Sequence, residues 1–200
     1  MTGFDVALKS SECWLELATG ERITLPVDRW RATEPSDEML LAHCSGPTLD
    51  IGCGPGRLTS ALSVRGIPVL GIDVSAVAVR LTLARGAVAL RGDVFDPLPG
   101  EGRWHSALLA DGNVGIGGDP VRLLRRVRGL VARNGRVLVE LDPPGTGLRN
   151  HSVRVNGLGT WFPWAWVGAD AVDEIALQAG FRSRWVAEGG NRWFTELVPR

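Results

Sequence analysis

The sequence predicts an α/β fold with a largely parallel sheet, and three observations support this prediction. From residue 48 onward, short apolar segments alternate with segments whose apolar residues recur at helical spacing, which is typical of parallel βαβ units. The first apolar segment leads into a turn with glycine at every second position, as where a strand meets a helix N-terminus. Near the end of the chain, two apolar segments flank Glu-Gly-Gly-Asn at 188–191, which predicts a hairpin.

The expected helices carry start and stop signals. Ser75 can cap one helix, and Asp119 followed by Pro120 can begin another. Gly86 and Asn134 end these two helices. In chain order, strands are expected from 48 and over 67–72, 88–91, 104–110, 136–141, 182–187 and 192–198, and helices over 57–65, 75–84, from 119 to the stop at 134, and over 170–179.

Two segments lie outside this alternation. Residues 12–27 predict a small hairpin and residues 37–44 a short helix. Because an isolated hairpin is only marginally stable, it should either cap a cleft as a lid or pack on another subunit. Residues 142–168 form a long glycine-rich connection, of the kind that is functional or mobile. We therefore expect an N-terminal extension or lid over 1–46 and one globular unit over 47–200.

Composition narrows the classes of function. Two hundred residues with 44% hydrophobic content suit one domain with a sizeable core. The 22 basic and 22 acidic residues balance, so the overall charge favours neither nucleic acid nor an anionic membrane as a partner. No apolar stretch approaches the roughly 20 residues that span a bilayer, and we expect a cytoplasmic protein. Three cysteines without Cys-x-x-Cys spacing and three scattered histidines predict neither a disulfide nor a metal site.

Residues 48–56 read Thr-Leu-Asp-Ile-Gly-Cys-Gly-Pro-Gly, a strand followed by a glycine turn. Gly52, Gly54 and Gly56 can take positive φ, so a ligand can lie directly against the backbone. A dinucleotide fingerprint would need its third glycine where Arg57 stands. Asp50 instead completes Asp-x-Gly-x-Gly-x-Gly, which resembles motif I of the class I S-adenosylmethionine (SAM) methyltransferases. Residues 49–57 and 111–120 also resemble those of uncharacterised small actinobacterial methyltransferases.

The resemblance covers roughly 48–200 and implies a three-layer sandwich. Its sheet would be mostly parallel, with seven strands in the order 3-2-1-4-5-7-6 and the last strand antiparallel. SAM would be the cofactor and S-adenosylhomocysteine (SAH) the product. The Asp73 carboxylate would bind the ribose hydroxyls and Asp93 the adenine amino group, although either residue could merely cap a turn, and Cys53 could be a small residue under the ligand. The residues expected to bind the cofactor are Asp50, Gly52, Cys53, Gly54, Gly56, Asp73, Val74, Asp93, Val94 and Ala110.

In such methyltransferases, the loop after the fourth strand passes the reacting groups. This makes Asp111 and Asn113 the expected contacts, although both could simply cap turns. Methyl transfer is an in-line displacement, so holding two reactants in line is the main task. A hydroxyl or protonated amine acceptor also needs a base, for which Asp111 and His151 are candidates. His151 could instead be solvent-exposed.

Eight tryptophans are many for a chain of this length. Trp161 and Trp164 lie in the glycine-rich connection and Trp30 beside the expected lid, where they could form an aromatic wall around an acceptor. They could also pin a loop to the sheet, whereas Trp104 and the two tryptophans near the end of the chain should be core. Asp-Pro-Pro-Gly at 142–145 resembles an aminomethyltransferase motif, but it follows the wrong strand and lacks the aromatic residue.

The sequence therefore favours a SAM-dependent methyltransferase acting on a small-molecule acceptor through an oxygen, nitrogen or carbon nucleophile. It would be a monomer or homodimer, with no metal, nucleic acid or membrane as partner. Three alternatives remain: an RNA or protein methyltransferase, a non-catalytic SAM or SAH binding module, and a nicotinamide-binding protein.

Overall fold

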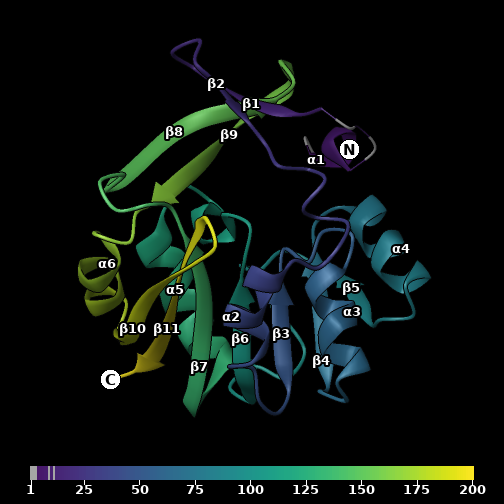
Figure 1. Ribbon diagram of the computed structural model, residues 1–200, viewed down its shortest axis with the longest axis vertical. Helices are drawn as coiled ribbons and strands as arrows, with labels where there is room; N and C mark the ends of the chain where they lie inside the picture. The colour runs from purple at the N-terminus through teal and green to yellow at the C-terminus, as the bar shows by residue number, and fades with distance from the viewer. Residues whose placement is uncertain (1–3, 9, 11) are drawn as a thin grey trace.

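The computed structural model describes residues 4–8, 10 and 12–200, and the strands of this part form two sheets (Figure 1). The larger sheet has seven strands in the order β10-β11-β7-β6-β3-β4-β5. The strands from β3 to β7 run parallel, and β11 is antiparallel to both neighbours. Numbered along the chain within this sheet, this is the order that the resemblance implies. The strands are β3 (Thr48–Ile51), β4 (Val69–Asp73), β5 (Ala89–Arg91), β6 (Trp104–Leu109), β7 (Val131–Leu141), β10 (Phe181–Gly189) and β11 (Arg192–Pro199).

Buried side chains of the central strands alternate between two helical layers. Leu109 and Val139 belong to one apolar cluster with residues of α5 (Pro120–Leu130) and α6 (Val172–Gln178). Leu108 and Leu138 belong to a second cluster, with residues of α2 (Glu38–Leu41) and α3 (Arg57–Val64). Because successive strand residues point to opposite faces, these clusters lie on the two sides of the sheet. The architecture is therefore a three-layer α/β sandwich.

The predicted helix caps are confirmed, but one predicted helix end is wrong. The Ser75 side chain accepts hydrogen bonds from the first turn of α4 (Ala76–Ala84), and Asp119 does the same for α5. The sequence predicts that α5 continues to a stop at Asn134, whereas it ends at Leu130 and β7 begins at Val131. Val131 is buried and pairs with the first residue of β6. A buried β-branched residue suits a strand as well as a helix face, which is why the boundary was misplaced.

The smaller sheet, which we call the cap, lies beyond the carboxyl ends of the parallel strands (Figure 1). Its antiparallel strands follow the order β2-β1-β8-β9. The expectation of a long connection over 142–168 was wrong, because β8 (Leu148–Val155) and β9 (Leu158–Val167) form a hairpin there. Asn156 and Gly157, with φ of 51° and 67°, make its turn, and Asn-Gly is a strong signal for this turn.

The expected N-terminal hairpin is present and packs on the same chain. It consists of β1 (Trp14–Leu17) and β2 (Arg22–Thr24), and β1 pairs with β8. Leu15, Leu17 and Val153 are buried in an apolar core within the cap, together with a residue of α1 (Phe4–Ala7). The chain then returns to the larger sheet through η1 (Pro35–Asp37) and α2, which lie within or beside the short helix expected at 37–44.

The cap meets the larger sheet at η2 (Asn113–Gly115). A Cβ on Gly115 would lie only 1.9 Å from the carbonyl oxygen of Ala165 in β9, so only glycine permits this approach. Ile116 forms an isolated bridge with Trp164 at the same junction. Among the described residues, no helix has the length and apolar character needed to cross a membrane.

Candidate active site

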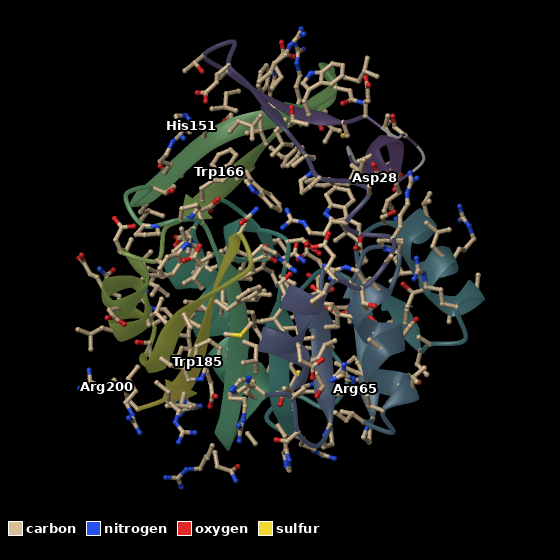
Figure 2. The ribbon with its side chains drawn as sticks, viewed as in Figure 1. Asp28, Arg65, His151, Trp166, Trp185 and Arg200 are labelled. Atoms are coloured by element: carbon tan, nitrogen blue, oxygen red, sulfur yellow. The ribbon has the colours of Figure 1, made fainter. Side chains whose placement is uncertain are left out.

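A cavity of about 810 Å³ lies between the carboxyl ends of the parallel strands and the cap. Small-molecule sites typically have volumes of roughly 300–1,000 Å³. The strand-end half of the cavity is lined by residues that follow or end β3, β4, β5 and β6. The cap half is lined by α1, the N-terminal hairpin, residues 25–30 and β9. Figure 2 shows Trp166 between the cap and the larger sheet.

The glycine turn after β3 fits closely against its neighbours. Gly52 has a φ of 71°, and a Cβ there would lie 2.6 Å from Nδ2 of Asn113. Nδ2 donates hydrogen bonds of 2.9 Å to the carbonyls of both Ile51 and Gly52. Both amide hydrogens of Asn113 are thus used on the turn. Asn113 thus positions the turn, and because it also lines the cavity, its contact with reacting groups stays a prediction.

Asp73 and Asp93 stand at neighbouring strand ends and line the cavity. The Asp73 carboxylate accepts hydrogen bonds from the N–H groups of Gly54 (3.0 Å) and Ser75 (2.8 Å). Asp93 accepts one from the N–H of Phe95, at 2.9 Å. These bonds orient both carboxylates and leave oxygen lone pairs for a ligand. Burial raises the pKa of Asp73.

Most of the expected cofactor residues are brought together. Gly56 does not line the cavity; with a φ of 83° it forms the N-cap of α3. The cavity is lined by the other nine: Asp50, Gly52, Cys53, Gly54, Asp73, Val74, Asp93, Val94 and Ala110.

Asp50 and Cys53 are both buried in this half of the site. Asp50 accepts a 2.6 Å hydrogen bond from Oγ1 of Thr59. Burial raises the pKa of Asp50 to about 6, although the Thr59 hydrogen bond lowers it. Burial, followed by the carboxylates of Asp50 and Asp73, raises the pKa of the Cys53 thiol. Cys53 is therefore an unreactive small residue at the cavity wall.

Five charged side chains form a buried ion cluster beside the cavity: Asp37, Arg57, Asp111, Glu140 and Arg192. Arg57 pairs with Asp37 and with Asp111, the latter at 2.6 Å. Arg192 contacts Asp37 and Glu140 at 2.6 Å each. Removing one partner from such a cluster would leave a buried charge uncompensated. The sequence points only to Asp111 as a site residue, because no motif or spacing links the five elements involved.

Asp111 belongs to this cluster as well as to the cavity wall. Its φ of 52° is unusual for a residue other than glycine, and its backbone N–H donates a 2.6 Å hydrogen bond to Glu140. Burial, followed by the Glu140 carboxylate, raises the pKa of Asp111, while Arg57 and Arg192 lower it. Since the Asp111 carboxylate is held between two arginines, we interpret it as orienting the loop after β6.

An aromatic wall lines the cap half: Phe4, Trp30, Phe162, Trp164 and Trp166. The Phe4 ring centroid lies 5.4 Å from that of Trp164 and 5.6 Å from that of Phe162. Trp30 and Trp164 are the two expected acceptor-binding residues found here. Phe162, Trp164 and Trp166 occupy every second position of β9, so all three lie on the same face of the strand. The alternation was present in the sequence but could be used only once this segment was known to be a strand.

Trp161 and His151 do not line the cavity, which corrects their expected roles there. Trp161 is 44% exposed on the other face of β9, where the Arg154 guanidinium lies 4.7 Å from the ring centroid. His151 lies on β8, with its ring 6.2 Å from that of Trp166. Figure 2 shows His151 at the outer margin of the cap.

Asp142 is a cavity-lining carboxylate missing from the predicted site. It follows β7, next to the strand that leads to Asp111. Unlike Asp111 and Glu140, it makes no salt bridge to any described residue. Burial raises the pKa of Asp142. In the described part of the chain, no group of three or more His, Cys, Asp or Glu side chains is arranged to hold a metal ion.

Comparisons with known proteins agree with this geometry. Residues 49–139 match the family described as "Methyltransferase domain". A SAM-dependent methyltransferase from Bacteroides fragilis, in complex with SAH, is similar with a TM-score of 0.77 at 21% identity, over 98% of this chain and 91% of that one. A 1,6-didemethyltoxoflavin-N1-methyltransferase from Burkholderia thailandensis, with 1,6-didemethyltoxoflavin and SAH, gives 0.65 at 18% identity, over 83% and 77%.

A third similar structure is an O-methyltransferase from neocarzinostatin biosynthesis, with SAH and 1,4-dihydroxy-2-naphthoic acid. Its TM-score is 0.62 at 22% identity, over 80% of this chain and 52% of that one. The family match covers the glycine turn, Asp73, Asp93 and the loop after β6. Residues 49–139 are therefore similar to a methyltransferase domain, and the chain has the fold of the SAM-dependent methyltransferases.

Proposed function

We propose that this protein transfers a methyl group from SAM to a small-molecule acceptor with a planar ring. The observation that carries the proposal is one cavity with two chemically different halves. The strand-end half offers main-chain groups and carboxylates, and the cap half offers aromatic rings. Because the cap covers the cavity, the site suits a small molecule better than a segment of RNA or protein.

The strand-end half has the groups that SAM requires. Two well-oriented carboxylates, Asp73 and Asp93, suit the ribose hydroxyls and the adenine amino group. Gly52 and Gly54 have positive φ and expose the backbone to the methionine end. When bound, SAM supplies a methyl group already activated on a sulfonium.

The protein's part in the reaction is to hold the acceptor in line and to take a proton. The aromatic wall restricts the orientation of a planar acceptor, and such alignment can contribute about 7–11 kcal/mol to lowering the barrier. The acceptor's lone pair forms the new bond to the methyl carbon, and the electrons of the broken carbon–sulfur bond stay on sulfur. If the acceptor atom carries a hydrogen, Asp142 receives the proton. Its carboxylate makes no salt bridge to a described residue and its pKa is raised, so it fits this role better than Asp111 does.

Two of the similar structures support the choice of a small acceptor. They hold 1,6-didemethyltoxoflavin and 1,4-dihydroxy-2-naphthoic acid beside SAH. The aromatic wall of this chain is the reason to extend that substrate class to it.

The cofactor assignment is tested by calorimetric titration with SAH and, separately, with NAD. We expect SAH to bind and NAD not to bind. Asp73→Ala should weaken SAH binding by about tenfold to 100-fold, because hydrogen bonds to a charged group are worth about 1.5–3 kcal/mol. Asp96→Ala, which removes an exposed carboxylate close to the same sheet edge, is the matched control and should bind SAH normally. Preference for NAD, or equal SAH binding by both variants, would overturn the assignment.

The role of Asp142 is tested with labelled SAM and a panel of hydroxylated and aminated aromatic acceptors. With an acceptor that the wild type methylates, Asp142→Asn should lower turnover by about 10²-fold or more while leaving SAH affinity unchanged. The variant keeps nearly the same side-chain volume, so packing in the cavity is preserved. Full turnover by Asp142→Asn would rule out its role as proton acceptor.

A further inference from the structure

Arg29 has unused hydrogen-bonding capacity at the cavity wall. It lies between β2 and η1, and its side chain is 23% exposed. An arginine carries five N–H donors in a planar fork. Yet its guanidinium donates no hydrogen bond to any described residue, and its one ion pair there joins Nη1 to Oε1 of Glu140 at 3.6 Å. Its Nε is also enclosed without a partner in the described chain.

Glu140 does not account for this arginine. The Glu140 carboxylate already accepts hydrogen bonds from Nε (2.8 Å) and Nη2 (2.6 Å) of Arg192, as well as the 2.6 Å bond from the Asp111 backbone. Charge-assisted hydrogen bonds between arginine and a carboxylate normally measure about 2.7–2.9 Å. Arg29 thus balances the third carboxylate of the ion cluster by charge but not by hydrogen bonding.

The backbone fixes Arg29 next to the aromatic wall. The N–H of Arg29 donates to the carbonyl of Pro26 at 3.0 Å, and the N–H of Trp30 donates to that of Val27 at 3.2 Å. These two turns direct adjacent residues, a guanidinium and an indole, into one cavity. The fork of a guanidinium matches the two oxygens of a carboxylate.

We propose that Arg29 binds the carboxylate of a cavity ligand and thereby ties the cap to that ligand. Two ligands could supply the carboxylate: the amino-acid end of the cofactor, or an aromatic acid serving as acceptor. Either source gives Arg29 the short hydrogen bonds it lacks within the described chain. The proposal rests on the proposed function, since both sources of the carboxylate are ligands of the proposed methyl transfer.

The test compares ligands with and without a carboxylate in the wild type and in Arg29→Gln. The first pair is SAH and 5′-methylthioadenosine, which lacks the amino-acid end. The second pair, titrated with and without saturating SAH, is 2-naphthoate and the neutral 2-naphthol. In one of the two pairs, we expect Arg29→Gln to lower the affinity for the ligand with a carboxylate by about tenfold or more. The affinity for the ligand without a carboxylate should fall by less than about twofold. The affected pair identifies the source of the carboxylate.

One control variant and three outcomes make the result interpretable. Arg122→Gln removes another cavity arginine, whose guanidinium lies 4.4 Å from the Phe95 ring centroid, and should leave both affinity ratios unchanged. Unchanged ratios in Arg29→Gln would overturn the proposal. A thermal midpoint lowered by more than about 4 °C together with unchanged ratios would assign Arg29 to structural charge balance. If the wild type binds no SAH, the proposed function fails, and the naphthoate pair still tests Arg29.

Discussion

The two halves of the cavity are assembled in different ways. The strand-end half comes from consecutive βα units, and its polar contacts are mostly between a side chain and a nearby backbone group, as with Asp73 and Gly54. The cap half combines segments that lie far apart in the sequence, since Leu15 in β1 pairs with Val155 in β8. Its lining combines the aromatic wall and Arg29 with several aliphatic side chains. We therefore propose that cofactor binding rests on the larger sheet, whereas acceptor binding depends on how the cap docks.

Two junctions fix the shape of the cavity: one lies on the strand-end side, and the other joins that side to the cap. The buried ion cluster joins η1, α3, the loop after β6, β7 and β11, and it supports the floor of the cavity. The contact of Gly115 with Ala165 joins η2 to β9. If the two halves are assembled in this way, breaking the ion cluster should damage both halves of the cavity. Breaking the contact of Gly115 with Ala165 should damage mainly the cap half.

Arg192→Met should have the largest effect. It leaves the carboxylates of Asp37 and Glu140 buried without their shared partner, which costs about 3–5 kcal/mol of unfolding free energy. Urea unfolding measures this, and SAH affinity should fall as well because Glu140 orients the Asp111 backbone. The control is Arg182→Met, which removes an exposed arginine from β10 and should change stability by less than about 0.5 kcal/mol. A loss below about 1 kcal/mol in Arg192→Met would mean that the cluster does not support the floor of the cavity.

The same division explains what could be read from the sequence. The glycine turn, Asp73, Asp93 and the caps of α4 and α5 are local patterns, and each was predicted where it occurs. The N-terminal hairpin of the cap was predicted, but its pairing with β8 was not, because the two strands lie far apart in the sequence. The hairpin of β8 and β9 was missed because the many glycines of 142–168 outweighed the Asn-Gly turn at 156–157. The ion cluster has no sequence signal because its members meet only through the tertiary fold.

Asp50→Asn tests the strand-end half of the cavity through the pH dependence of the unfolding free energy. Burial raises the pKa of Asp50 from an ordinary 3.8 to about 6. The folded state therefore binds this proton more tightly than the unfolded state, and ionisation of Asp50 destabilises the fold as the pH rises through 6. Relative to wild type, Asp50→Asn should become more stable by about 3 kcal/mol between about pH 4 and pH 8.

Urea unfolding of both proteins across this pH range checks the Asp50 prediction. SAH affinity should change in the opposite direction and fall in Asp50→Asn, because we propose that the Asp50 region receives the cationic methionine end. Thr59→Val removes the hydrogen bond that lowers the Asp50 pKa and should extend the loss of stability to higher pH. Parallel stability curves for wild type and Asp50→Asn would contradict the burial argument.

Gly115→Ala should have a smaller effect, and one confined to the cap. Its added Cβ would overlap the Ala165 carbonyl, so η2 and β9 must separate at a cost of about 1–3 kcal/mol. Affinity for an aromatic acceptor should fall more than affinity for SAH, because Trp164 and Trp166 move with β9. Gly129→Ala is the matched control: the site is exposed in α5 with nothing within 4 Å of the new Cβ, and helix propensity predicts a gain of about 0.5–1 kcal/mol. Equal losses of SAH and acceptor affinity in Gly115→Ala would mean that the cap also holds the cofactor, which is the outcome expected if the carboxylate bound by Arg29 belongs to SAH.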